Sequence, residues 1–309
     1  MIGKLYLGVD GGQSSTKALV GNSQGEILGR GLGGPCNHAG AGEGRAKLER
    51  ALSEAVGQAL APLGLNLAEA RFHRICVGMS GGPDDKREII QRLIKADSYD
   101  VTTDAHVALY GAVGGGAGAV VIAGTGSMAL SRDGQGRIWR VGGWGYVFGD
   151  EGSAFDIARL SLRAALAAEE GWGPGTSLRA DLLTMTQSGS ANQLLHRWYA
   201  GEFSRDQTAD WSRLVEEAAA EGDAVAESIL CGAGKHLAEL AATAAKMASL
   251  PSGAAKVCPI GGAFASVKLM QSFSQSLGQV LGIGPATPAA SPATGALRAA
   301  TEGIVLSRN

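Results

Sequence analysis

The feature that most constrains the fold is a pattern that occurs twice along the chain. Residues 5–31 and 119–143 each begin with a short apolar run typical of a buried strand, followed by a glycine-rich turn that carries a hydroxyl residue. In both segments a second strand, a polar turn with glycine and a third strand follow in the same order, at nearly equal spacing. Hairpins are common, so a chance likeness is the alternative. Agreement in both order and spacing favours two related lobes.

Strands and helices alternate between and after the two copies. We expect, in order, helix 45–63, strand 72–82, helix 84–96, strand 99–103, a helix from Asp104 to 113, and then helices 153–170, 176–186 and 208–249. A strand, a glycine turn and two further helices close the chain. This alternation predicts an α/β fold. We expect one lobe over 1–113, completed by the helix 293–309, and a second over 114–292 with helical insertions.

Composition and charge exclude several functional classes. A single hydrophobic core rarely serves more than about 250–300 residues, so the 309 residues fit two lobes. The formal net charge of −2 offers no electrostatic attraction to nucleic acid or an anionic membrane. No apolar run approaches the ~18 residues of a membrane span. Four separated cysteines with no CxxC pair argue against a zinc ribbon or a disulfide framework. With no signal peptide before the first strand, we expect a cytoplasmic protein.

The first glycine-rich turn, DGGQSS, follows a buried strand. The backbone N–H groups of Gly11 and Gly12 and the hydroxyls of Ser14 and Ser15 suit an anion, and Asp10 at the strand end suits Mg²⁺, usually held through water. An Asp-Gly hairpin turn is the ordinary alternative.

Two later glycine turns strengthen the anion hypothesis. The turn GTGS (124–127) could face the first turn across a cleft, and together the two turns would clamp a polyphosphate. The turn GGAFAS (261–266) follows another strand, and its bare backbone could lie flat against a planar ligand such as adenine. A tight strand–helix turn is the alternative for that segment. The chain has no GxxxxGK[ST] motif, and no GxGxxG stands at a strand–helix junction, so P-loop and dinucleotide sites lose their main support.

Asp104 stands where a short strand passes into a helix. Acids at the carboxyl ends of strands in open α/β sheets face the ligand crevice, so Asp104 is a candidate general base. A simple helix N-cap is the competing interpretation, because Asp is among the best caps.

The segment GGWGYVFGDEGSAF (142–155) combines glycines, a tryptophan and neighbouring acids. Ser153 could cap the next helix, which would account for Asp150 and Glu151 but not for the glycines and Trp144. A carboxylate beside an aromatic plate suits a sugar, whose hydroxyls donate to the acid while its apolar face lies on the ring.

Taken in order, the segments GVDGGQSSTKAL, DAHVAL, IAGTGSM, GGWGYVFGDEGSAF and PIGGAFAS resemble the N-acetylglucosamine kinase and BadF/BadG/BcrA/BcrD ATPase family. That family belongs to the sugar kinase, Hsp70 and actin superfamily. The resemblance spans Asp10 to about Ser266, and 142–155 is its most specific part. It implies two ribonuclease-H-like lobes, an actin-like ATPase fold, with ATP and sugar in a central cleft.

The resemblance also implies roles for single residues. Asp104 matches the family's catalytic base, and Asp10 matches its magnesium-linked carboxylate. The residues that match the family's ATP contacts are Gly11, Gly12, Ser14, Ser15, Gly124, Thr125, Gly126, Gly261, Gly262 and Ala263. Those that match its sugar contacts are Asn37, Asp104, Ser127, Gly143, Trp144, Gly145 and Asp150. Many relatives have a third glycine and a threonine after DGG. Here the Ser14 hydroxyl can replace that of threonine.

The implied activity is ATP- and Mg²⁺-dependent phosphorylation of a small amino sugar, N-acetylglucosamine at its 6-hydroxyl. Glucosamine and N-acetylmuramic acid are alternative substrates, and a homodimer is an open alternative for the assembly, since relatives are often dimers. A BadF-type activator ATPase would need paired cysteines for an iron–sulfur cluster, which these four scattered cysteines disfavour. A sugar-sensing repressor would need a helix-turn-helix, but the first strand starts at about residue 4.

Overall fold

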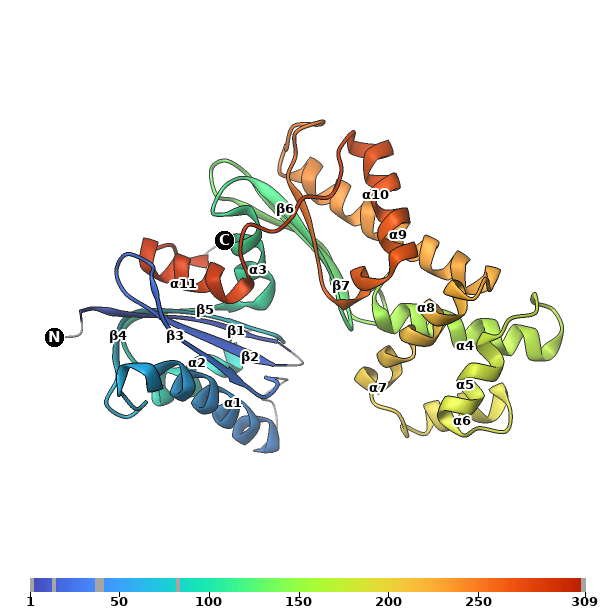
Figure 1. Cartoon of the computed structure of the whole chain (residues 1–309), viewed down its shortest axis with the longest axis horizontal. Coiled ribbons are helices and arrows are strands. Elements are labelled where there is room, and N and C mark those ends of the chain that lie inside the picture. The colour runs from blue at the N-terminus through green and yellow to red at the C-terminus, as the bar shows by residue number, and fades with distance from the viewer. Residues whose placement is uncertain (1–2, 13–14, 37–41, 82–83, 307–309) are drawn as a thin grey trace. The chain divides into compact units, whose positions relative to one another are not determined.

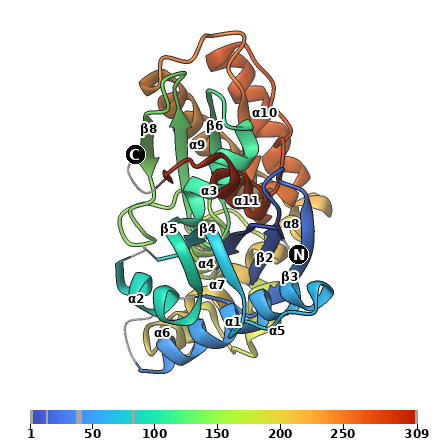
Figure 2. The ribbon, with the colours of Figure 1, turned by 90° about the vertical axis from the view of Figure 1, so that its left-hand side faces the viewer.

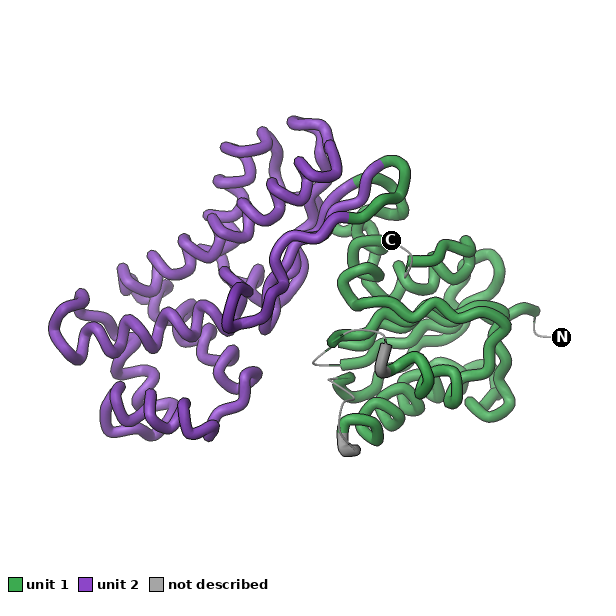
Figure 3. Tube along the Cα trace, turned by 180° about the vertical axis from the view of Figure 1, so that it is seen from behind, with its two compact units in different colours: residues 1–117, 134–138, 287–309 green, residues 118–133, 139–286 purple. Residues whose placement is uncertain are grey.

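The computed structural model describes the chain except for residues 1–2, 13–14, 37–41, 82–83 and 307–309. Contacts between Cα atoms divide it into two compact units (Figure 3). Unit 1 comprises Met1–Ala117, Gly134–Ile138 and Thr287–Asn309, and unit 2 comprises Gly118–Asp133 and Trp139–Ala286. The lobe boundaries expected from the sequence stay a prediction, because a unit of contacts need not coincide with a functional lobe.

Unit 1 is built on a five-stranded sheet in the order β3-β2-β1-β4-β5. Its elements are β1 (Leu5–Gly11), β2 (Thr16–Gly21), β3 (Ile27–Gly33), α1 (Gly42–Leu60), η1 (Ala61–Leu63), β4 (Arg71–Met79), α2 (Asp84–Leu93), β5 (Lys95–Thr103), α3 (Asp104–Val113) and α11 (Pro292–Glu302). β1, β2 and β3 form the predicted antiparallel meander, and β4 and β5 run parallel to β1.

Helix α2 is shorter than the sequence predicts. It ends at Leu93, and the residues from Lys95 onward pair with β4, so the expectation of a helix to residue 96 is wrong. The Tyr99 hydroxyl stabilises this early strand start by donating to the Ile94 carbonyl at 2.7 Å and accepting from the Ala96 N–H at 2.9 Å.

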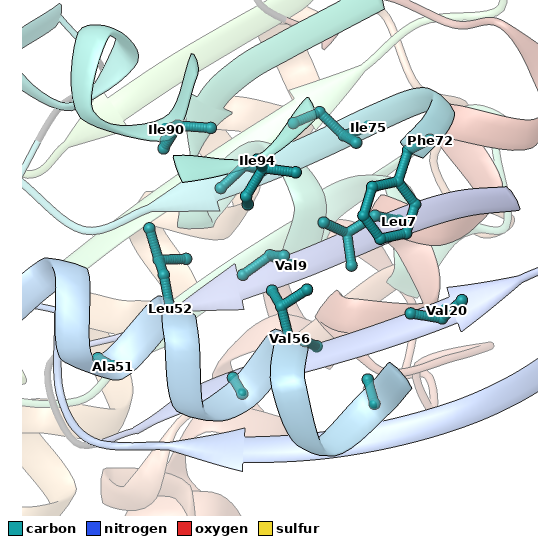
Figure 4. Packing of buried hydrophobic residues seen from close by; sticks show 14 of the residues in the cluster. Leu7, Val9, Val20, Ala51, Leu52, Val56, Phe72, Ile75, Ile90 and Ile94 are labelled. Carbon is teal, nitrogen blue, oxygen red and sulfur yellow. The ribbon is translucent and has the colours of Figure 1, made fainter. Parts of the chain in front are cut away.

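Helices cover both faces of the unit 1 sheet (Figures 1 and 2). On one face, Leu7 and Val9 of β1 pack with Leu52 and Val56 of α1 and with Ile90 of α2 (Figure 4). On the other face, residues of α3 and α11 pack against the same strands. The strands are therefore buried on both sides, as parallel α/β strands are.

Glycines let α1 approach β3 closely. A Cβ atom on Gly29, Gly31 or Gly33 would lie 1.9, 1.8 or 2.1 Å from a carbonyl oxygen of α1. Because the three glycines occupy alternate positions of β3, they lie on the same face of the strand. This glycine stripe, which has no side chains, faces α1.

Unit 2 contains the second meander in a four-stranded sheet, β8-β7-β6-β9. Its elements are β6 (Gly118–Ala123), β7 (Ser127–Arg132), β8 (Ile138–Gly142), α4 (Ala154–Glu170), α5 (Leu178–Thr186), α6 (Ala191–Tyr199), α7 (Arg205–Asp210), α8 (Ser212–Ala220), α9 (Ala224–Met247), β9 (Val257–Ile260), η2 (Gly262–Ala265) and α10 (Val267–Leu281). β6 pairs antiparallel with β7 and parallel with β9. Two sheets with covering helices confirm the α/β fold class.

The helical part of unit 2 departs from the sequence-based expectation. The stretch 208–249 is mostly helical, as expected, but it is divided among α7, α8 and α9, and Gly222 with φ +95° and the Asp223 N-cap start α9 afresh. Helix α6 was not predicted; Ser190 caps it by accepting from the Gln193 N–H. No helix in the described part of the chain is long and apolar enough to cross a membrane.

Candidate active site

Three chain segments with polar groups meet at one edge of the unit 1 sheet. β1, β4 and β5 are parallel, and their register places Gly11 beside Met79 and Met79 beside Thr103. Asp10, Ser80 and Asp104 therefore lie at the carboxyl ends of neighbouring strands, where open α/β sheets bind ligands.

Asp104 is the first residue of α3 and does not cap it. The N-cap is Thr103, whose hydroxyl oxygen accepts from the His106 N–H at 3.3 Å, so the N-cap interpretation of Asp104 is wrong. One oxygen of the Asp104 carboxylate accepts from the Ala105 N–H at 2.9 Å. Burial raises the pKa of Asp104, while the Ala105 N–H, the Ser80 hydroxyl and the Lys86 ammonium act in the opposite direction.

Asp10 lies in the same electrostatic environment. Burial, followed by the charge of Asp104, raises the pKa of Asp10 to about 6, although the charge of Lys17 opposes the shift. The charge of Asp104 thus disfavours ionisation of Asp10 at a site that holds both carboxyl groups. Such a site gains from a bound cation.

The first glycine turn is tied to its surroundings through the backbone. Gly12 donates to the Ser15 carbonyl at 3.0 Å and accepts from the Cys36 N–H at 3.0 Å, and the Ser80 N–H donates to the Gly11 carbonyl at 2.8 Å. These bonds fix the described part of the turn. Of the predicted site residues, Ser14 and Asn37 lie outside the described residues.

In unit 2, two glycine turns share one sheet edge. β6 and β9 are parallel, so the turns after Ala123 and after Ile260 start side by side. Gly261 has φ +116°, and a Cβ atom there would lie 2.3 Å from the Ala123 carbonyl oxygen, so only glycine fits. The structure thus brings Gly124–Ser127 together with Gly261–Ala263 at one edge of the unit 2 sheet.

The turn 124–127 is also bound to the segment that follows β8. The Ala154 N–H donates to the Gly124 carbonyl at 2.9 Å, and the buried Ser127 hydroxyl donates to the Glu151 carbonyl at 2.7 Å. Ser127 thus acts as a brace for the segment 142–155 in this structure. Ser153 is the N-cap of α4, as predicted, and accepts from the Asp156 N–H.

Trp144 stands on a loop of left-handed glycines. Gly142, Gly143 and Gly145 have φ values of +74°, +73° and +84°, which explains the glycine density. Arg140 donates to the Gly142 and Gly143 carbonyls, and its guanidinium lies 5.1 Å from the Trp144 ring centroid. The Trp144 side chain is 72% exposed, so its ring is available to a ligand.

Asp150 is buried, at 5% exposure, and has a left-handed φ of +64°. Its Oδ2 accepts from Nη2 of Arg205 at 2.6 Å. Sequence reasoning missed Arg205 as well as Ser80 and Lys86. No motif marks Arg205, which stands at the start of α7, far along the chain from Asp150.

Two solved structures share the fold of this chain. A protein of Chromobacterium violaceum, described as a candidate N-acetylglucosamine kinase, aligns with a TM-score of 0.79 at 24% identity over 96% of this chain and 98% of its own. A ROK family glucokinase of Streptomyces griseus, solved with glucose and AMPPNP, aligns with a TM-score of 0.54 at 20% identity over 97% and 100%. The fold is therefore that of the actin-like ATPases and sugar kinases.

The family follows from the sequence. Residues 7–300 match the BadF/BadG/BcrA/BcrD ATPase family, and the chain belongs to it. The chain is 32% identical, over 76% of its length and 77% of the relative, to an N-acetylmuramic acid/N-acetylglucosamine kinase of Clostridium acetobutylicum. It is 31% identical, over 77% and 78%, to an N-acetyl-D-glucosamine kinase of Dictyostelium discoideum.

Proposed function

We propose that this protein is an ATP-dependent amino sugar kinase that transfers the γ-phosphoryl group of ATP to the 6-hydroxyl of N-acetylglucosamine. The observation that carries the proposal is the placement of Asp10 and Asp104 at the carboxyl ends of the parallel strands β1 and β5 of one sheet, with raised pKa values. Family membership and the names of the relatives supply the reaction class.

In unit 1, Asp104 accepts the proton of the attacking hydroxyl. A carboxylate with a raised pKa is a stronger base than an ordinary aspartate, because its proton affinity lies closer to the working pH. The Ala105 N–H and the Ser80 hydroxyl hold the carboxylate in place. Phosphoryl transfer through a loose transition state depends chiefly on positioning and charge neutralisation, so modest basicity suffices.

The residues of unit 1 fit a bound magnesium ion. Asp10 carries a carboxylate whose pKa is raised by burial and by Asp104, and a cation relieves both effects. In the described part of the chain, no three His, Cys, Asp or Glu side chains form a metal cluster, so Asp10 would hold the ion through water and phosphate oxygens. Bound there, Mg²⁺ supplies neutralisation of phosphate charge.

In unit 2, the glycine turns and the segment 142–155 take the ligand-binding roles. A Cβ atom on Gly124 or Gly262 would meet nothing within 4 Å, so the backbone beside these residues is open to a phosphate or a nucleoside. Trp144 offers a flat apolar ring and Asp150 a carboxylate, which together suit a hexose.

A wild-type assay over several sugars tests the proposal. We expect ADP release from Mg-ATP to depend on N-acetylglucosamine, and we expect Trp144→Ala to raise the KM for the sugar about tenfold or more while the KM for ATP changes by less than about twofold. Equal effects on both KM values would mean that Trp144 is only structural.

N-acetylmuramic acid is the second candidate substrate, because it is named for the Clostridium acetobutylicum relative. Glucosamine, N-acetylmuramic acid and glucose therefore belong in the same assay. An activator ATPase is disfavoured, since Cys36, Cys76 and Cys258 are buried and only Cys231 is partly accessible for a cluster shared between subunits.

A further inference from the structure

Arg205 joins three segments of unit 2. It is the first residue of α7, and its Nη2 donates to Asp150 Oδ2 at 2.6 Å and, in a longer bond, to the Thr125 carbonyl at 3.4 Å. Its guanidinium also lies 5.3 Å from the ring centroid of Tyr146 and 6.0 Å from that of Phe155. One side chain therefore contacts the turn 124–127, the segment 142–155 and the start of α4.

The helix start that carries Arg205 is well defined. Ser204 caps α7 and forms a capping box with Gln207, in which each side chain bonds to the backbone of the other residue. The Thr208 hydroxyl accepts from the Trp198 indole N–H at 3.1 Å, which ties α7 to α6. The Asp206 carboxylate accepts from the Thr125 hydroxyl at 3.2 Å. The position of Arg205 is thus fixed independently of its own ion pair.

Asp150 depends on this arginine. Its backbone has a left-handed conformation that costs energy for residues other than glycine, and its carboxylate is almost fully removed from solvent. A buried carboxylate needs a charged partner, and Arg205 provides it. Without that partner, Asp150 would turn towards water.

The ion pair leaves one carboxylate oxygen for a ligand. Arg205 occupies Oδ2, whereas Oδ1 accepts no hydrogen bond within the described residues. Since the charge of Arg205 is already balanced by Asp150, the pair offers an acceptor and no net positive charge. It therefore suits a hydroxyl donor of a sugar rather than an anionic group.

The neighbouring turn is shaped around the same pair. A Cβ atom on Gly126 would lie 2.7 Å from Asp150 Oδ2 and 2.9 Å from Arg205 Nη2, so one of these two side-chain ends would have to shift. Arg205 Nε is buried and, within the described part of the chain, has no hydrogen-bond partner. A donor left unsatisfied in this way is costly, which indicates that the guanidinium is placed for its contact with Asp150 rather than for stability.

From this geometry we propose that Arg205 is a positioning residue for the acceptor sugar. It holds the Asp150 carboxylate and the Thr125 carbonyl so that Asp150 Oδ1 receives a sugar hydroxyl. The inference rests on the proposed sugar kinase function and adds a residue from α7 to the sugar site. Arg205 acts through Asp150 and takes no part in the chemical step.

The test compares Arg205→Met, Arg205→Lys, Asp150→Asn and the double variant Arg205→Met/Asp150→Asn in steady-state kinetics. We expect Arg205→Met to raise the KM for the sugar about tenfold or more, with the KM for ATP within about twofold of wild type. Arg205→Lys restores part of the loss, since it keeps one charged donor. The double variant is no worse than Asp150→Asn alone, because both changes break one interaction.

Arg213→Met is the matched control, since Arg213 is an exposed arginine on α8 that forms a surface ion pair with Asp210 at 3.5 Å. Thermal unfolding shows which variants fold. If Arg205→Met does not fold, the kinetics of Arg205→Lys provide the test. An unchanged sugar KM in a folded Arg205 variant, or effects of Arg205→Met and Asp150→Asn that simply add, would overturn the positioning role alone. A wild-type enzyme that phosphorylates no sugar would overturn the proposed function, and this inference with it.

Discussion

At the scale of single residues, the chemistry proposed for unit 1 depends on two carboxyl groups whose pKa values the fold raises. Burial and the Asp104 charge raise the pKa of Asp10 from 3.8 to about 6. Between these two pH values the unfolded chain has lost its proton while the native state keeps it. The free energy of unfolding of the unliganded protein therefore falls as pH rises through this window, and the penalty is complete above about pH 6.

We predict that Asp10→Asn stabilises the unliganded protein at pH 7.5 by about 1–2 kcal/mol, after allowance for solvent screening at this partly exposed group. The gain should disappear at about pH 3, below the ordinary value of the group, where the carboxyl group is largely protonated in both states. Urea unfolding of both proteins at the two pH values measures it. A stabilisation that is equal at both pH values would contradict the electrostatic origin.

We predict that Gly126→Ala lowers kcat/KM for the sugar about tenfold or more, since its Cβ would displace the carboxylate of Asp150 or the guanidinium of Arg205. Gly134→Ala is the control, because a Cβ there meets nothing within 4 Å. Steady-state kinetics of both variants measure kcat/KM for the sugar. If Gly126→Ala behaves like Gly134→Ala, the tight packing of the pair on this turn has no functional role.

At the scale of elements, the contact of α1 with β3 depends on the glycine stripe. We predict that Gly31→Ala lowers the free energy of unfolding by about 2–3 kcal/mol, because its Cβ would lie 1.8 Å from the Ala55 carbonyl oxygen and force the helix away. Gly57→Ala, on α1 itself, has open space at its Cβ and should instead stabilise by about 0.5–1 kcal/mol. Changes of the same sign in both variants would contradict this account of the packing.

The sequence predicts an element well where periodicity and turn chemistry agree. Both meanders, helix α4 with its Ser153 cap and the strand before Asp104 are confirmed. The stretch 208–249 is helical as expected, but in three separate helices. Its breaks come from caps and packing that local pattern does not reveal. Helix α6 was missed because its Ser190 cap is recognisable only once the helix is known.

At the scale of the whole molecule, the duplicated meander gives each unit its own sheet edge with a glycine turn. Sequence motifs find residues at such turns and at strand ends, which is why Asp10, Asp104 and Asp150 could be proposed from the sequence. Arg205 could not, since it reaches Asp150 from another element through tertiary packing alone. The roles of all these residues remain predictions that kinetics must test.

The most direct test of the sugar kinase proposal is sugar-dependent ADP release by wild type and by Asp104→Asn. We predict turnover with Mg-ATP and N-acetylglucosamine that falls by about 10²–10⁴-fold in the variant, while the dissociation constant of the sugar changes little. ATP hydrolysis at a rate that does not depend on the sugar, or an Asp104→Asn variant as active as wild type, would contradict the sugar kinase proposal.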